Sequence, residues 1–183
     1  MRTSLVARLW PIICCSVAFS FAAIAQAQEA VRLLDGKLKI SLPSGFASDN
    51  DRATKQAIAG FKAKKGDAWG AVSRGTHGVK PEDLPEWMTK KVADYTKGLS
   101  WLPKLTWLKK EIVTIDGRPW ADLRFIAPKE KAKGPRDGLM YTRVLATSYD
   151  GQLLELMLSS NTDPDPSTKD KIDQIIASVK LEE

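Results

Sequence analysis

The sequence predicts an α+β domain, in which an antiparallel sheet is built from hairpins and a helix follows each pair of hairpins. Three observations lead to this fold class. Asp-Gly pairs, which favour two-residue hairpin turns because both residues accept positive φ, recur between apolar segments. Two other segments carry apolar residues at three- and four-residue spacing, which indicates helices packed on one side. Strands do not alternate singly with helices, so no run of parallel crossovers is expected.

Residues 1–27 have the pattern of a secretory signal peptide. Two arginines give a positive start, residues 12–24 are apolar, and small residues lead up to Ala27. The apolar run is shorter than the roughly 20 residues that a membrane-spanning helix needs. We therefore expect cleavage after Ala27, or alternatively after Ala25, and a periplasmic or secreted protein with no integral membrane segment after cleavage.

The two cysteines of the chain, Cys14 and Cys15, lie inside this leader. A lipoprotein signal would place a small residue before a cysteine at the end of the apolar run. Here Ile13 precedes Cys14 and apolar residues continue beyond Cys15, so lipidation is disfavoured. Cleavage leaves residues 28–183 without a thiol, which excludes disulfides, thiolate nucleophiles and cysteine metal sites. This remainder has the length of one domain that can bury its own core.

Turn chemistry predicts the strand pairs. The first Asp-Gly pair predicts a two-residue loop that places Leu33 opposite Leu38 and gives that hairpin one apolar face. The third pair places Leu145 opposite Leu156, and both faces of its hairpin are apolar, which is typical of strands in the middle of a sheet. The Asp-Gly pairs lie at 35–36, 116–117 and 150–151, and a Gly-Asp pair at 66–67 predicts a fourth hairpin.

Two helices interrupt these hairpins. The first is expected at residues 81–97, ending before Gly98, a residue that suits a helix C-terminus. The second is expected at residues 166–178, where Asp165 can cap the free N–H groups and Pro166 suits the first helical position. The apolar stripes are Leu84, Trp87, Met88, Val92, Tyr95 and Leu99 in the first helix and Ile172, Ile175, Ile176 and Val179 in the second.

Four stretches of the chain carry a family resemblance. They are DGKLKISLPSGF, IDGRPWADLRFIAP, YTRVLATSYDGQLLELMLSS and IDQIIASVKL. Together they resemble the PsbP and DcrB-like superfamily of small α/β/α sandwich domains over nearly the whole of residues 28–183. The resemblance implies a binding scaffold of the kind that accessory and adaptor proteins use. It carries no catalytic residue over to this chain, because the fold has no shared catalytic motif.

Few residues are suited to a metal site or a catalytic triad. His77 is the only histidine, whereas a zinc site takes three or four protein ligands, so a loop histidine without metal is the simpler interpretation. A histidine-based serine hydrolase would depend on His77, and no Gly-x-Ser-x-Gly turn occurs. Asp163, Asp165 and Ser167 alternate as in a calcium loop, but the glycine and glutamate that such a loop needs are missing, and helix capping accounts for the same residues. We expect no metal, no cofactor and no catalytic residue.

Carboxylates are the remaining candidates for acid–base chemistry. The register of the second hairpin places Glu111 opposite Asp122, with Glu155 on another strand. Two carboxylates that close can raise a pKa, as glycosidases require. Because Lys109 and Arg124 fall on the same face, solvated ion pairing across the strands is the simpler interpretation.

A positively charged stretch follows the second hairpin. The basic loop, residues 129–138, either keeps the protein soluble or contacts an anionic partner of the envelope. The formal net charge of the whole chain is +6, and the leader includes two of the arginines. The mature domain is thus mildly basic and is not expected to bind nucleic acid. The cationic residues of this loop are Lys129, Lys131, Lys133 and Arg136.

The apolar connection, residues 99–105, is the strongest candidate for a binding surface. Connections are normally exposed and polar, so this one either closes one end of the core or contacts a partner. The candidate contact residues are Trp101, Leu102 and Leu105.

These features favour a non-enzymatic exported accessory or adaptor protein that contacts another envelope protein. A periplasmic binder of a small ligand or of an envelope polyanion through the basic loop is the alternative, and a hydrolase comes third. A pocket with converging polar groups would favour the ligand binder, and an apolar patch would favour the adaptor. The sequence sets no oligomeric state.

Overall fold

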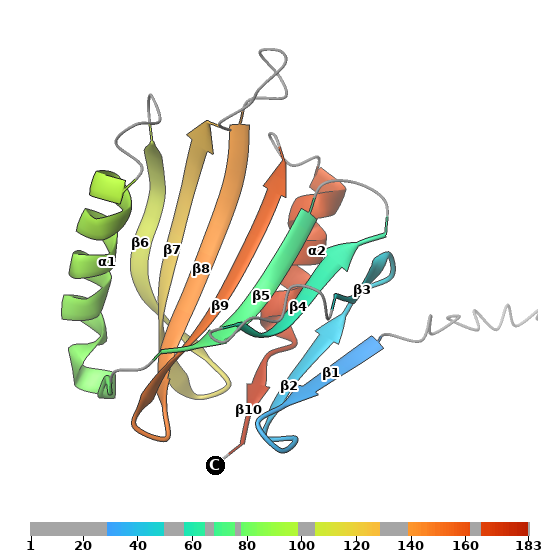
Figure 1. Cartoon of the computed structure of the whole chain (residues 1–183), viewed down its shortest axis with the longest axis horizontal. Helices are drawn as coiled ribbons and strands as arrows, with labels where there is room; N and C mark the ends of the chain where they lie inside the picture. The colour runs from blue at the N-terminus through green and yellow to red at the C-terminus, as the bar shows by residue number, and fades with distance from the viewer. Residues whose placement is uncertain are drawn as a thin grey trace, which may run out of the picture.

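The computed structural model describes residues 29–49, 57–64, 68–75, 78–98, 105–128, 139–161 and 166–182. The predicted leader lies outside these residues. Figure 1 shows the elements. They are β1 (Glu29–Leu33), β2 (Leu38–Leu42), β3 (Phe46–Ser48), β4 (Ala57–Ala63), β5 (Ala68–Arg74), a 3-10 turn (Pro81–Asp83), α1 (Leu84–Gly98), β6 (Thr106–Ile115), β7 (Arg118–Pro128), β8 (Leu139–Tyr149), β9 (Gln152–Asn161), α2 (Pro166–Ala177) and β10 (Lys180–Leu181).

The strands form two antiparallel sheets. The larger sheet has seven strands in the order β3-β4-β5-β9-β8-β7-β6, and the smaller has three in the order β1-β2-β10. The predicted registers are confirmed, because Leu33 pairs with Leu38 and Leu145 pairs with Leu156. The hairpin that is apolar on both faces, β8-β9, lies in the middle of the large sheet as predicted.

The turns adopt the backbone geometry that their sequences predict. Asp35, Asp116 and Asp150 have φ values of 56°, 50° and 50°, and each following glycine is positive too. Such geometry matches the twist of the flanking strands in the two-residue loops at 116–117 and 150–151. The first loop keeps the predicted register but spans residues 34–37, and Leu34 also has a positive φ, of 54°. The Gly-Asp pair at 66–67 lies outside the described residues, but β4 and β5 on either side of it pair with each other.

The chain forms two sheets rather than the predicted one. The first hairpin is apolar on one face only, with Ile40 buried and Arg32 exposed. A sheet with one apolar face buries that face by packing against the core, and β1-β2 does so instead of extending the large sheet. The short strands β3 and β10, of three and two residues, were not predicted. They are too short to show a period in the sequence.

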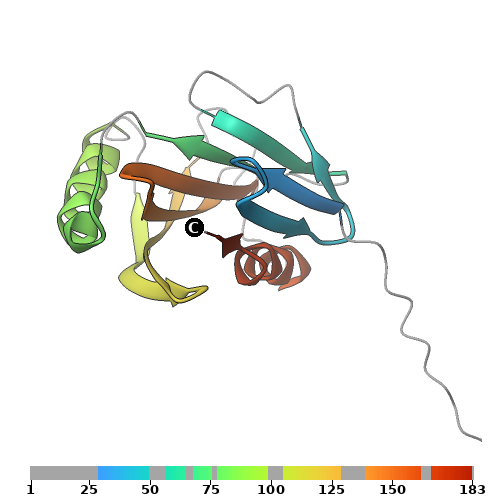
Figure 2. The same ribbon diagram turned by 90° about the horizontal axis from the view of Figure 1, so that it is seen from below.

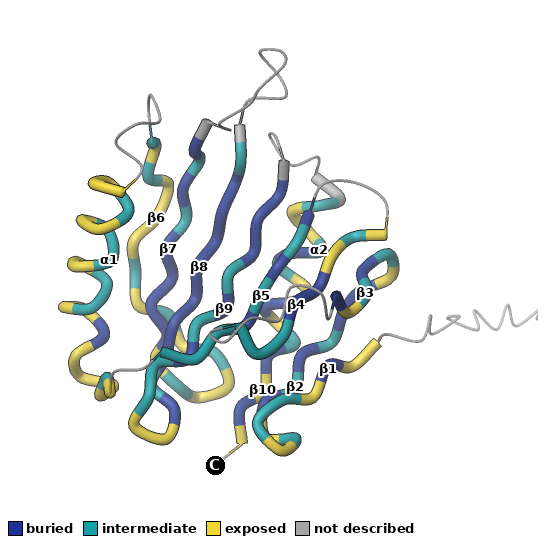
Figure 3. The backbone as a smooth tube through the Cα atoms, in the orientation of Figure 1, coloured by how far each residue is buried: buried dark blue, intermediate teal, exposed yellow. Residues whose placement is uncertain are grey.

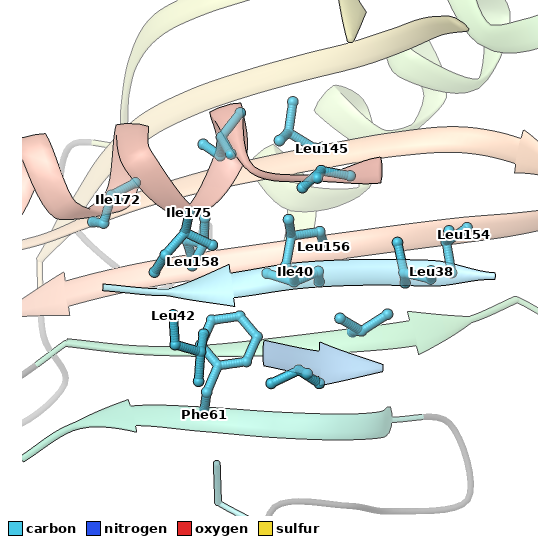
Figure 4. Packing of buried hydrophobic residues seen from close by; sticks show 14 of the residues in the cluster. Leu38, Ile40, Leu42, Phe61, Leu145, Leu154, Leu156, Leu158, Ile172 and Ile175 are labelled. Atoms are coloured by element: carbon cyan, nitrogen blue, oxygen red, sulfur yellow. The ribbon is translucent and has the colours of Figure 1, made fainter. Parts of the chain in front are cut away.

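The main core lies between the large sheet, the small sheet and α2. Figure 4 shows Ile172 and Ile175 of α2 above Ile40 of β2 and Leu156 of β9. All four predicted apolar residues of the second helix are buried, so that prediction is confirmed. Each large side chain buried in this way contributes about 1.5–3 kcal/mol. Gly70 of β5 allows the close approach of the Phe61 ring to the backbone.

Helix α1 packs on the other face of the large sheet. Its residues Trp87 and Tyr95 contact a second cluster that includes Leu123 and Phe125 of β7. Leu123 and its neighbour Asp122 point to opposite faces because strand side chains alternate. Figure 2 shows the two helices on opposite sides of the curved sheet. In the described part of the chain, no helix has the length and apolar character that crossing a membrane requires.

Candidate functional site

One end of the large sheet brings together the two segments that the sequence singles out. Thr106, at the start of β6, pairs with Ile126 of β7, which in turn pairs with Tyr141 of β8. The apolar connection leads into β6, and the basic loop joins β7 to β8. These three strands are neighbours, so the two segments flank the same end of the sheet (Figure 1). We call this the contact end. Its described residues are Leu105, Thr106, Ala127, Pro128, Leu139 and Met140.

Most of the predicted contact residues lie outside the described residues. Leu105 is the exception, and it is half-buried against the cluster beneath α1. Beside it, Tyr95 and Trp107 both pack on Phe125, with ring centroids 5.2 and 5.1 Å away. The described end of the apolar connection therefore closes the α1 cluster, as the core interpretation expects. Trp101, Leu102, Lys129, Lys131, Lys133 and Arg136 are the predicted residues that lie outside the described part of the chain.

Beside the contact end, β6 carries exposed apolar side chains. Leu108 and Ile112 are 48% and 41% exposed, and they are the exposed large hydrophobic residues in the described part of the chain. Figure 3 shows the exposed positions along this strand in yellow. Sequence reasoning missed this surface because it predicts the β6-β7 hairpin but not that β6 lies at the edge of the sheet.

A groove of about 520 Å³ lies between α1 and the face of β5 and β9. On its floor Lys91 Nζ bonds to Glu155 Oε2 at 2.8 Å, and the same Nζ lies 5.2 Å from the centre of the Tyr95 ring. Burial, with a contribution from the Glu155 charge, raises the pKa of Tyr95, so its hydroxyl stays neutral. Lys90 and Asp94 line the exposed rim. This α1 groove therefore gathers polar groups of both signs, and it was not predicted because its walls are far apart in the sequence.

The predicted carboxylate pair forms and is ion-paired, as the simpler interpretation expects, but the ion pairs of Asp122 are buried rather than solvated. Glu111 pairs with Asp122 across β6 and β7 as expected. Asp122 is fully buried, and its Oδ2 accepts hydrogen bonds from Arg124 Nη2 at 2.6 Å and from Arg143 Nη2 at 2.7 Å. Arg143 also bonds to Asp173 of α2 at 2.7 Å. The sequence did not reveal Arg143 as a partner because it comes from β8.

The cluster keeps Asp122 ionised. Burial alone would raise the pKa of Asp122, but the hydrogen bonds from Arg124 and Arg143, together with their charges, outweigh it and lower that pKa. A carboxylate held in this way does not donate a proton at neutral pH. Glu155 faces the α1 groove on the opposite side of the sheet, where it pairs with Lys91. The three carboxylates are therefore not brought into one site.

No metal site is evident among the residues that the structure describes. Within them, no group of three or more histidine, cysteine, aspartate or glutamate side chains could hold an ion. His77, Asp163 and Asp165 lie outside the described residues, so the expectations for the lone histidine and for the calcium-like stretch remain predictions.

Comparison with known proteins identifies the fold. No family model and no curated protein matches the sequence. Cyanobacterial PsbP (CyanoP) from Synechocystis sp. PCC 6803 is similar with a TM-score of 0.57 at 17% identity, covering 88% of this chain and 97% of its own. LpqN of Mycobacterium tuberculosis, described as involved in cell envelope biogenesis, has a TM-score of 0.55 at 13% identity over 86% of this chain and 91% of its own.

A third similar structure comes from a eukaryote. Mog1p, a Ran-binding protein of Saccharomyces cerevisiae, has a TM-score of 0.57 at 12% identity, covering 85% of this chain and 95% of its own. At these identities the likeness concerns the fold. The chain has the PsbP-like fold, as the sequence resemblance predicted.

Proposed function

We propose that this protein is a non-enzymatic accessory protein of the cell envelope that acts as an adaptor by binding another protein at the contact end. The observation that carries the proposal is the register of β6, β7 and β8, which gathers the flanks of the apolar connection and of the basic loop at one end of the sheet. Export through the predicted leader would deliver the domain to the periplasm or to the outside of the cell.

The two segments supply complementary kinds of contact. Trp101 and Leu102 would offer an aromatic and apolar centre of the kind that carries much of the binding energy at protein interfaces, beside Leu105, which is half-buried against the α1 cluster. The four cations of the basic loop would surround it and favour an acidic partner surface. Among proteins of this fold, Mog1p binds the protein Ran, which is a precedent for protein binding by this scaffold.

The described chemistry supports binding over catalysis. Asp122 is ionised and held by two arginines, and Glu155 is held by Lys91. Asp122, whose pKa is lowered by these arginines, is therefore not available as a general acid in its described arrangement.

Cross-linking in the native envelope, followed by mass spectrometry of the captured proteins, tests the proposal. The wild type is compared with Trp101→Ala, with a variant in which all four loop cations are glutamine, and with Asp150→Ala at the opposite end of the sheet. We expect one envelope protein to be captured by the wild type and by Asp150→Ala, and to be lost from the two contact-end variants. Equal capture by all four proteins would contradict the proposal.

The α1 groove favours a second candidate, a binder of a small anionic ligand or of an envelope polyanion. Its volume is that of a small-molecule site, and polar groups converge on it. Titration with inorganic polyphosphate at low and high salt tests this candidate. Loss of binding in Lys90→Gln would assign the site to the groove, and loss only in the loop variant would assign it to the basic loop. No binding at low salt would rule out the polyanion.

A further inference from the structure

Strand β6 leaves one edge of the large sheet open. It pairs with β7 on one side, and within the described residues no strand pairs with its other side. The strand is ten residues long, and Leu108 and Ile112, the exposed large hydrophobic residues of the described part of the chain, belong to it. A long edge strand with apolar side chains is a ready template for pairing with another strand.

The hairpin turn determines which backbone groups of β6 face outward. Ile115 pairs with Arg118 across the two-residue turn at 116–117. The pair that closes such a turn exchanges hydrogen bonds, and pairs along the ladder then alternate between bonded and non-bonded. Counting back from Ile115, Ile112 and Lys110 therefore direct their N–H and C=O groups toward the open edge.

Leu108 has no partner on β7. Trp107 pairs with Phe125, and Lys109 pairs with the adjacent Arg124, so the ladder passes over Leu108. Its side chain is 48% exposed, and it lies two residues before Lys110, whose backbone groups face the open edge. The unpaired residue and the outward backbone groups together form one surface.

We propose that two copies of this chain pair through their β6 strands, antiparallel, about a two-fold axis at Lys110. In this register Leu108 lies opposite Ile112 of the second copy, so the exposed apolar side chains cover each other. Lys109 lies opposite Glu111 of the second copy. Symmetry makes each of these two contacts occur twice, whereas the Lys110 pair lies on the axis and occurs once. This inference goes beyond the adaptor function, because it concerns the sheet edge rather than the contact end.

The charges of β6 select a second copy over an unrelated strand. Edge lysines usually discourage pairing with other strands. Lys109 and Glu111 are both accessible, with Nζ and Oε1 3.1 Å apart in one copy. In the dimer they occupy non-bonded pairs, where Cα atoms are about 4.5 Å apart and side chains are closest. Lys110 faces its own copy, which is unfavourable, but its Nζ already lies 5.7 Å from the Trp107 ring of its own chain.

Other registers of the two β6 strands pair fewer of their exposed apolar and charged side chains. An axis at Ile112 places Leu108 opposite Asp116 and leaves no opposite charges paired. An axis at Leu108 places Ile112 beyond Thr106, the first residue of β6. An axis at an odd-numbered residue passes through a non-bonded pair, which the alternation allows, but it never places Leu108 opposite Ile112, and at Lys109 or Glu111 it places like charges opposite each other. Lys110 is the axis that pairs both the apolar and the charged residues.

Cysteine cross-linking tests the register. In a background of Cys14→Ser and Cys15→Ser, Lys110→Cys places two thiols on the axis with Cα atoms about 5.5 Å apart, within the range that a disulfide spans. Ile112→Cys is the matched control, because its two copies would lie about 14 Å apart along the strands. We expect oxidation to give a disulfide dimer of Lys110→Cys and none of Ile112→Cys. A dimer of Ile112→Cys alone would overturn this register.

Charge reversal tests the pairing without a covalent bond. Sedimentation equilibrium of the purified protein is expected to show a dimer that Lys109→Glu weakens about tenfold or more, since two attractive pairs become repulsive. The double variant Lys109→Glu/Glu111→Lys restores the opposite charges and should restore the dimer. Circular dichroism and urea unfolding show whether each variant keeps its fold. A folded wild type that stays monomeric, with no cross-link of Lys110→Cys, would overturn the proposal.

Discussion

Replacing Asp122 by asparagine should destabilise the fold strongly at neutral pH. The substitution keeps the shape of the side chain but removes the charge that faces Arg124 and Arg143. Breaking a buried ion pair by removing one partner costs about 3–5 kcal/mol. The lower end of this range applies here, because Arg143 keeps Asp173 at 2.7 Å and Arg124 keeps Glu111 at 3.7 Å. We therefore expect a loss of about 3 kcal/mol in the free energy of unfolding.

The pH dependence of this loss is equally specific. The pKa of Asp122 is lowered in the folded protein relative to its ordinary value of 3.8. Its contribution to stability is therefore present above that value and disappears as the pH falls through the lower folded value. The difference between the wild type and Asp122→Asn should be constant at neutral pH and shrink below about pH 4.

Urea unfolding at pH 7 and along an acidic series measures both effects. Glu111→Gln is the matched control, since this carboxylate is 39% exposed and its loss should cost at most about 1 kcal/mol. A loss below about 1 kcal/mol for Asp122→Asn at pH 7 would refute the reasoning that Asp122 anchors a structural cluster. A difference that does not change with pH would refute the assigned ionisation.

Three further predictions concern packing, the lone histidine and the apolar connection. Gly70→Ala would overlap the Phe61 ring and should cost about 1–3 kcal/mol in urea unfolding, whereas Gly98→Ala, whose new methyl group has no described atom outside its own stretch of helix within 4 Å, should not. His77→Ala should change the free energy of unfolding by no more than about 0.5 kcal/mol and should rescue the phenotype that deletion of the protein produces. One equivalent of bound metal in the wild type would overturn the prediction that His77 has no chemical role. Trp101→Ala should lose its partner at near-normal stability; a drop of about 3–5 kcal/mol would instead place Trp101 in the core.

The hairpins and helices could be predicted because they depend on local signals in the sequence. Asp35, Asp116 and Asp150 begin Asp-Gly pairs, and both residue types accept the positive φ that these turns require. The paired residues of the flanking strands could therefore be predicted by counting outward from each turn. The helical spacing of the apolar residues from Ile172 to Val179 was enough to predict a helix with one face packed on the sheet. These features depend on residues that are neighbours in the chain.

Long-range features were not accessible in the same way. The position of β6 at an edge depends on which strand pairs with β5, and that strand, β9, lies far along the chain. Arg143 reaches Asp122 only because β8 pairs with β7. The α1 groove joins a helix to strands on both sides of it in the sequence. Sequence patterns predict each helix or strand that lines such a site, but not which of these elements lie next to one another in the fold.

Site-specific photo-cross-linking in the native envelope tests the central claim, that the contact end binds another protein, most directly. A photoreactive amino acid is placed at Trp101 in one protein and at Asp150, at the opposite end of the sheet, in another. The account predicts one dominant adduct with a single envelope protein from position 101 and none from position 150. No protein adduct at position 101, or the same adducts at both positions, would contradict it.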